Sequence, residues 1–245
     1  MFGFYRNFLD GKPFYLVRHY WWAYLWPKSV WFFDHQPIIN AILFGQYNKL
    51  MQATLERLRQ APLERALQLT CVYGSLTPNL IRQVAPLPLH ITDVAEVQLD
   101  LAGSKRKAGQ QLCPTRMNAE SLGYKANSFS TVVLFFLLHE MPPEARRNTL
   151  SECMRVIRDG GVLLVTEYGK LPKSHLLYRL YPIRWITTKL EPFLEGFWHE
   201  DVEALLNELG QAYEKEVRVT SHKDIFSAFY RVTEFTIVKC GAHKE

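Results

Sequence analysis

A histidine and a glutamate stand side by side where a long apolar run of the chain ends. Residues 129–138 are so uniformly apolar that they indicate a central strand buried on both faces of a sheet, and His139 and Glu140 follow. An imidazole beside a carboxylate can deprotonate a nucleophile or ligate a metal ion. Glu140 could instead cap a helix expected to begin near Pro143. Because neighbours on a continuing strand face opposite sides, only one of the pair is expected in a site.

Acidic side chains also follow two other expected strands. Asp93 closes the run of residues 89–94, and Glu167 with Tyr168 closes the run of residues 161–167. Ligands of open α/β sheets bind beyond the carboxyl ends of the parallel strands. We therefore expect these residues at the same edge as His139, while a polar loop without function remains the alternative for Glu167 and Tyr168.

Strand-like and helix-like runs alternate from residue 67 onward. The expected strands span 67–72, 89–94, 129–138 and 161–167, the expected helices span 77–84, 97–107 and 143–157, and an antiparallel pair closes the chain at 213–219 and 231–238. Asp159-Gly160-Gly161 is expected to end the third helix. This order predicts an α/β protein with a doubly wound, mostly parallel sheet.

The loop after the first expected strand resembles a nucleotide-cofactor loop with most of its defining residues replaced. The first motif of the class I S-adenosylmethionine-dependent methyltransferases runs acidic, x, Gly, x, Gly, x, Gly, and the aligned residues here are Gln68, Thr70, Val72 and Gly74. Thr70 and Val72 are β-branched and should resist the positive φ and the close ligand approach that glycine permits. Gln68 replaces a carboxylate that would favour the charged form of the cofactor amine.

Further segments are similar to later motifs of the same enzymes. Asp93 matches the acidic residue that accepts hydrogen bonds from the cofactor ribose, and Asn118-Ala119-Glu120 resembles an Asp-Ala-Glu motif whose first position reaches the adenine. Residues 155–161 resemble the Arg-Val-Leu-Lys-Pro-Gly-Gly turn before the fifth strand. The resemblance implies a Rossmann-like fold that binds S-adenosylmethionine through Gln68, Thr70, Val72, Gly74, Asp93, Asn118 and Ala119.

Two segments outside this expected core combine aromatic residues with cations. Residues 14–33 contain ten aromatic residues, with Pro27 interrupting any helix, and residues 170–190 interleave Lys170, Lys173, Arg179, Arg184 and Lys189 with leucine, tyrosine and tryptophan. This composition is typical of elements at a lipid–water interface. Packing as an ordinary core is the structural alternative. Tryptophan clusters bounded by proline disfavour the charged groove of a nucleic-acid-binding protein.

Composition indicates one folded domain with an added segment. The chain has 245 residues, 48% hydrophobic and 22% charged, with a net charge of +5. Its four cysteines are too far apart for a zinc or redox motif, which fits a reducing cytoplasmic compartment. No apolar run approaches the roughly 20 residues of a membrane span. We expect a protein that is either soluble or bound to a membrane surface.

Four segments carry a closer resemblance, to the rhodoquinone biosynthesis enzymes. They are HYWWAYLWP at 19–27, PIINAILFG at 37–45, CVYGSLTP at 71–78 and FFLLHE at 135–140, and the resemblance extends over about residues 14–210. It implies a methyltransferase fold that does not methylate. Those enzymes convert ubiquinone to rhodoquinone, take the amino group from S-adenosylmethionine and need a divalent metal, preferably manganese.

The resemblance also assigns roles and regions. It implies His139, Glu140 and Tyr73 as catalytic residues and Glu140 with His139 as metal ligands, and it makes Gln68 the residue that allows a neutral cofactor amine. Residues 1–60 become an aromatic-rich helical segment for membrane and quinone access. Residues 61–245 become the methyltransferase-like domain, with an insertion around 170–198. The expected location is cytoplasmic and peripheral to the inner membrane, without a nucleic-acid partner.

Two other functions stay open at this point. The chain could be a conventional S-adenosylmethionine-dependent methyltransferase of quinones or lipids, because the fold expected from the motifs is shared. It could also be a non-catalytic domain that binds a membrane or a partner protein, because most glycines of the first motif are replaced.

Overall fold

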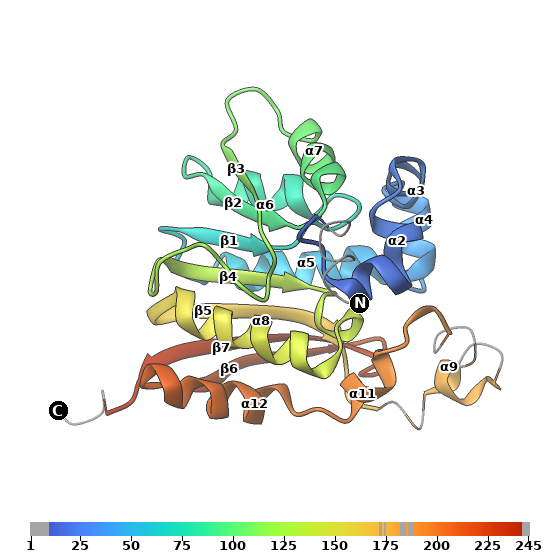
Figure 1. The fold of residues 1–245 in the computed structure, drawn as a ribbon. Coiled ribbons are helices and arrows are strands. Elements are labelled where there is room, and N and C mark those ends of the chain that lie inside the picture. Colours follow the sequence, from blue (N-terminus) through green and yellow to red (C-terminus); the bar gives the residue numbers. More distant parts are fainter. Residues whose placement is uncertain (1–9, 172, 174, 182–184, 186–188, 242–245) are drawn as a thin grey trace, which may run out of the picture.

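A seven-stranded sheet with the order β3-β2-β1-β4-β5-β7-β6 forms the centre of the protein (Figure 1). The computed structural model describes residues 10–171, 173, 175–181, 185 and 189–241. The parallel strands are β1 (Ala66–Leu69), β2 (Leu89–Asp93), β3 (Leu112–Arg116), β4 (Phe129–Phe135) and β5 (Ile157–Tyr168). β7 (Tyr230–Lys239) runs antiparallel to both β5 and β6 (Lys215–Ile225). The predicted α/β, mostly parallel fold is confirmed.

Helices cover both faces of the sheet. α5 (Tyr47–Leu58) and α6 (Leu76–Val84) lie behind it in Figure 1, and α8 (Pro143–Val156) and α12 (Val202–Gly210) lie in front. α7 (Glu96–Ser104) packs beside β2 and β3. Because β4 is the middle strand and is covered on both faces, all its residues are buried. This burial explains the uniformly apolar run in the sequence.

The N-terminal helices lie beyond the carboxyl ends of the parallel strands (Figure 1). They are the π-helix η1 (Leu16–Tyr20), α2 (Trp21–Tyr24), α3 (Pro27–Phe33) and α4 (Gln36–Ile42). Pro27 occupies the first turn of α3, where its missing N–H costs little, so the expected interruption is confirmed. The same end of the sheet carries the turn η2 (Leu138–Glu140) and the short helices α9 (Leu176–Arg179) and α11 (Leu194–Trp198), while η3 (Gln211–Tyr213) follows α12.

Several boundaries differ from the sequence-based prediction. β1 ends at Leu69 and β4 ends at Phe135, each three residues earlier than predicted. The residues that follow each strand form a loop or turn at the edge of the sheet. Asp159-Gly160-Gly161 does not end a helix but lies inside β5, where the register with β4 shifts between Phe129 and Thr131. β3 was not predicted. It is a short edge strand that contains Pro114, and proline is tolerated only at such positions.

One sequence-based expectation falls partly outside the described residues. Arg184 belongs to the basic and aromatic run of 170–190, and its structure is not described. Within the described part of the chain, no helix combines the length and the apolar character needed to cross a bilayer.

Candidate functional site

A cavity of about 490 Å³ opens between the carboxyl ends of the strands and the N-terminal helices. It is large enough for a small-molecule ligand. The cavity brings together most of the predicted site residues, namely Thr70, Val72, Tyr73, Asp93, Asn118, Ala119, His139 and Glu140. Gln68 and Gly74 do not line it, so their direct contact with a cofactor stays a prediction.

Two polar side chains with fixed orientation mark one end of the cavity. Asp93, at the end of β2, accepts hydrogen bonds from the backbone N–H groups of Cys71 at 2.9 Å and Ala95 at 2.8 Å. Burial raises the pKa of Asp93 to about 6, although these hydrogen bonds oppose the rise. Asn118 Oδ1 accepts the N–H of Glu120 at 3.0 Å. Both carboxylate and amide are therefore held in place before any ligand binds.

The altered loop reaches the left-handed backbone conformation without glycine. Thr70 has a φ of 70°, so the expectation that its β-branched side chain would prevent a positive φ is wrong. Gln68 supports this turn, because its Nε2 donates to the carbonyl of Thr70 at 3.0 Å. A carboxylate at position 68 could not donate this bond. The replacement of the acidic residue therefore has a structural consequence inside the loop itself.

Gly74 is required by packing against α5. Its φ is 79°, and an added Cβ would lie 2.6 Å from the hydroxyl oxygen of Tyr47. That hydroxyl accepts the N–H groups of Ser75 at 2.8 Å and Leu76 at 2.9 Å and donates to the carbonyl of Tyr73 at 3.0 Å. Tyr47 therefore satisfies backbone groups at the start of α6 that otherwise need a capping residue.

Tyr73 offers the cavity an aromatic ring. Its hydroxyl donates to the carbonyl of Ala23 at 2.5 Å and accepts from Gln98 Nε2 at 2.9 Å. The ring stacks on Tyr24 with centroids 5.7 Å apart. Because both hydroxyl functions are engaged, this geometry supports a role in shaping the cavity, and the predicted catalytic role remains a prediction.

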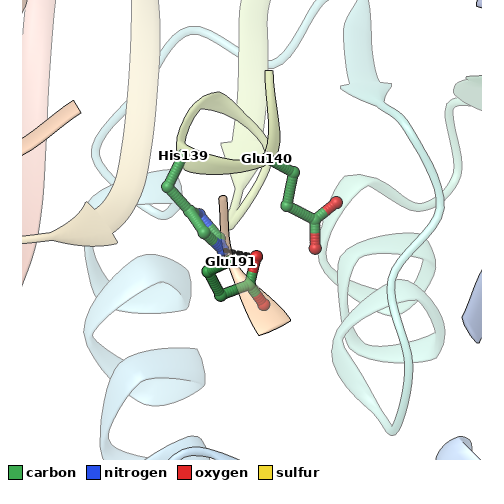
Figure 2. A group of neighbouring side chains, drawn as sticks. All are labelled: His139, Glu140 and Glu191. Carbon is green, nitrogen blue, oxygen red and sulfur yellow. Dashed lines mark ion pairs between the residues drawn. The ribbon is translucent and has the colours of Figure 1, made fainter. Parts of the chain in front are cut away.

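A cluster of potential metal ligands lies at the other end of the cavity. His139, Glu140 and Glu191 each offer a ligand atom, and these atoms lie within 4.8 Å of one another (Figure 2). His139 and Glu140 come from the same 3₁₀ turn, η2, which follows β4. The expectation that only one of them could face the site is wrong, because the strand does not continue to these residues.

Glu191 was not predicted from the sequence. The residue precedes α11, far along the chain from His139, and tertiary packing brings it to the cluster. The neighbouring Phe193 contacts the rings of Tyr15 and His19 in the N-terminal segment. No motif surrounds Glu191, so only these contacts across the chain could have identified it.

The carboxylate of Glu140 does not cap a helix. It accepts a short hydrogen bond from the hydroxyl of Tyr24, whereas α8 begins after Pro142 without any side-chain cap. The structural alternative for Glu140 is therefore wrong. The carboxylate faces the cavity and the N-terminal segment instead.

Charge and burial act on the cluster together. His139 is buried, which opposes its protonation, but the nearby carboxylate of Glu167, with smaller effects of Glu191 and Glu140, raises its pKa to about 9. Burial, followed by the charge of Glu191, raises the pKa of Glu140 to about 8, and burial also raises the pKa of Glu191. The cause of these shifts is that several acidic groups lie close together in a poorly solvated space. A bound cation would relieve that crowding.

Comparison with known proteins agrees with this architecture. Residues 66–161 match the family model described as a methyltransferase domain. The chain is 25% identical over 190 residues to the ubiquinone/menaquinone biosynthesis C-methyltransferase UbiE of Ralstonia nicotianae, a match covering 71% of this chain and 77% of the relative. It is 27% identical to the demethylmenaquinone methyltransferase of Lactiplantibacillus plantarum, with 62% and 64% covered.

Solved structures show the same fold. An arsenic(III) S-adenosylmethionine methyltransferase from Chlamydomonas reinhardtii superposes with a TM-score of 0.52 at 18% identity, covering 80% of this chain and 75% of that one. The magnesium protoporphyrin IX methyltransferase of Synechocystis, solved with bound SAH, gives 0.52 at 12% identity, covering 96% and 99%. This chain is therefore a protein of the class I S-adenosylmethionine-dependent methyltransferase fold, with quinone methyltransferases among its relatives.

Proposed function

We propose that this protein aminates ubiquinone, replacing a methoxy group of the quinone by an amino group taken from S-adenosylmethionine, in a reaction that needs a divalent cation. The cofactor nitrogen would bond to the ring carbon as the methoxy group leaves as methanol, and water would then cleave the bond between this nitrogen and the cofactor carbon. The observation that carries the proposal is the cluster of His139, Glu140 and Glu191 in the same cavity as Asp93 and Asn118. When bound, S-adenosylmethionine would supply the nitrogen, and the cation would act as a Lewis acid toward the quinone.

The residues at the strand ends fit the cofactor. The carboxylate of Asp93 can accept hydrogen bonds from ribose hydroxyls, and the amide oxygen of Asn118 keeps capacity for a second donor such as the adenine amine. Val94, Met117 and Ala119 line the cavity beside them and offer apolar surface to the base.

The cluster fits a hard divalent cation. Manganese accepts carboxylate oxygens and tolerates imidazole, which matches two glutamates and one histidine. We assign Glu140 and Glu191 as anionic ligands, and His139 as the nitrogen ligand or the base. The crowded carboxylates explain why a cation would bind more readily here than at an exposed acidic patch.

The remaining cavity wall fits a lipophilic quinone. Leu43, Phe135, Phe136 and Leu190 supply apolar surface to the cavity wall. Relatives of the chain are named as a C-methyltransferase of ubiquinone/menaquinone biosynthesis and a demethylmenaquinone methyltransferase, which supports a quinone substrate. The ring would then lie between the cofactor end and the cluster, within reach of both.

Exposed aromatic side chains support peripheral binding to a membrane. Large apolar residues are exposed on both added segments: Phe14, Trp21, Trp26, Trp31, Phe32 and Ile42 on one, and Leu176, Leu180, Tyr181, Trp185 and Leu190 on the other. Ile42 and Leu190 also line the cavity, so each segment reaches its rim. Sedimentation with anionic vesicles tests this: Trp31→Ser should reduce binding, and Val219→Ser, at an exposed apolar site on β6, should not.

Incubation of the purified protein with ubiquinone, S-adenosylmethionine and manganese tests the main proposal. Liquid chromatography with mass detection should show a quinone in which an amino group has replaced methoxy, and chelation of the metal should abolish it. Absence of that product with manganese present would refute the proposal.

Methyl transfer to a quinone is the second candidate. The named relatives are methyltransferases, and the fold is the one that they share, so the comparisons favour it over amination. The same assay with a demethylated quinone precursor would then give a product with one added methyl group. That product should form without a divalent cation.

A further inference from the structure

Each member of the cluster has one orienting partner, and these partners come from different parts of the chain. Tyr20 donates a hydrogen bond to Glu191 Oε2 at 3.0 Å, and Tyr24 donates to Glu140. His139 Nδ1 lies 2.8 Å from Glu167 Oε2. The proposed ligands are thus held by groups that do not themselves belong to the candidate ligand set.

The two tyrosines come from consecutive turns of the N-terminal segment. Tyr20 ends the π-helix η1 and Tyr24 ends α2, and their rings lie 6.1 Å apart. Each phenol therefore meets a different carboxylate of the same cluster. The π-helix is a rare conformation that is frequent at functional sites, and Tyr20 is its last residue here.

The carboxylate of Glu167 accepts hydrogen bonds from three backbone N–H groups. Its Oε1 accepts the N–H groups of Leu138 at 2.6 Å and His139 at 3.4 Å, and its Oε2 accepts the N–H of Tyr168 at 3.1 Å. The same carboxylate is hydrogen-bonded to Nδ1 of His139. The other ring nitrogen, Nε2, therefore faces Glu191, with 3.8 Å between Nε2 and Glu191 Oε2. A glutamine here would place an NH₂ group against one of these donors.

We propose that Tyr20, Tyr24 and Glu167 are positioning residues that hold Glu191, Glu140 and His139 as ligands of one divalent cation. This inference rests on the proposed function for the presence of the cation. Metal-bound histidine commonly donates its second ring nitrogen to a carboxylate, and ligating carboxylates are themselves hydrogen-bonded. Loss of such a partner typically lowers metal affinity about 10- to 100-fold.

Manganese affinity, measured without cofactor or quinone, tests the inference. Tyr20→Phe, Tyr24→Phe and Glu167→Gln should each raise the manganese dissociation constant about tenfold or more, by calorimetry or by electron paramagnetic resonance of the bound ion. Tyr230→Phe is the matched control, because Tyr230 is fully buried and its hydroxyl has no hydrogen-bond partner among the described residues. The resonance spectrum should also change in the first three variants, which a general loss of stability would not produce.

The outcomes separate this inference from the proposed function. Wild-type affinity in both tyrosine variants would overturn the positioning role while leaving the cation site intact. A wild-type protein that binds no manganese would overturn both. Weakened manganese binding in the variants, in a protein that forms no aminated quinone, would support the positioning role and refute only the amination. If Glu167→Gln does not fold, the two tyrosine variants still decide.

Discussion

The two ends of the cavity are built in different ways. The proposed cofactor end takes Asp93 from the last position of β2 and Asn118 from the loop after β3, and both are held by nearby backbone groups. The cluster end takes His139 and Glu140 from one turn, Glu191 from a distant segment, and its tyrosine partners from the N-terminal helices. The proposed nucleoside site is therefore built from residues at the strand ends of the common fold, whereas the cluster also needs Glu191 and the N-terminal helices.

The largest expected effect is at the cluster. Glu140→Gln keeps the size of the side chain but removes an anionic ligand, so turnover should fall at least about tenfold at limiting manganese and recover partly at high manganese. Thermal stability should not fall, because Glu140 caps no helix and the amide oxygen of glutamine can still accept the hydrogen bond from Tyr24. Steady-state rates across a manganese titration measure this, with Glu144→Gln in the first turn of α8 as the control. Full activity at limiting manganese would remove Glu140 from the ligand set.

A substitution at the proposed cofactor end should weaken cofactor binding without affecting manganese binding. Asp93→Ala removes charge-assisted hydrogen bonds worth about 1.5–3 kcal/mol each, so affinity for S-adenosylmethionine should fall about tenfold or more. Manganese affinity should stay as in the wild type, because Asp93 is not part of the cluster. Calorimetric titrations with each ligand measure the two effects. Asp100→Ala, at an exposed position of α7, is the control, and a joint loss of both affinities would contradict two independent ends.

The dependence of cofactor affinity on pH tests the role of the Asp93 charge. The pKa of Asp93 is raised to about 6 in the free protein, so its carboxylate is charged above that pH and becomes neutral as the pH falls through it. Affinity for S-adenosylmethionine should therefore decrease about tenfold between about pH 7.5 and about pH 5. In Asp93→Asn the affinity should not change over this range. An equally steep dependence in that variant would assign the titration to another group.

A change in stability, without a direct effect on a ligand, is expected where α5 supports the loop. Gly74→Ala forces a Cβ toward the Tyr47 hydroxyl and adds left-handed strain, so the free energy of unfolding should fall by more than the roughly 1–2 kcal/mol of the strain alone. Gly109→Ala is a matched control, since Gly109 has the same φ of 79° but open space around its Cβ position. Denaturant unfolding of both variants measures the difference. Equal losses would mean that Tyr47 can move aside without cost.

The elements of the fold that have a regular local pattern of residues could be predicted from the sequence. The apolar run of β4, the acidic end of β2 and the closing antiparallel pair were predictable, because burial on two faces and strand-end position leave a direct mark in the residues. The His139–Glu140 pair was also found, as it directly follows such a strand.

The rest depends on contacts that no local pattern encodes. Glu191 and Tyr20 are 171 positions apart, and only the folded chain brings them together. Thr70 appeared unable to adopt a positive φ, but the hydrogen bond from Gln68 to its carbonyl supports that conformation. β3 was not predicted, because it contains a proline and has no regular apolar pattern. An edge strand tolerates both features.

Isotope transfer from the cofactor distinguishes amination of the quinone from methylation. S-adenosylmethionine carrying a nitrogen label in its amino group and a carbon label in its methyl group would be incubated with ubiquinone, manganese and the protein. We predict that the quinone product contains the nitrogen label and no carbon label. A product with the carbon label, or a quinone unchanged in the presence of manganese, would contradict amination of the quinone by this protein.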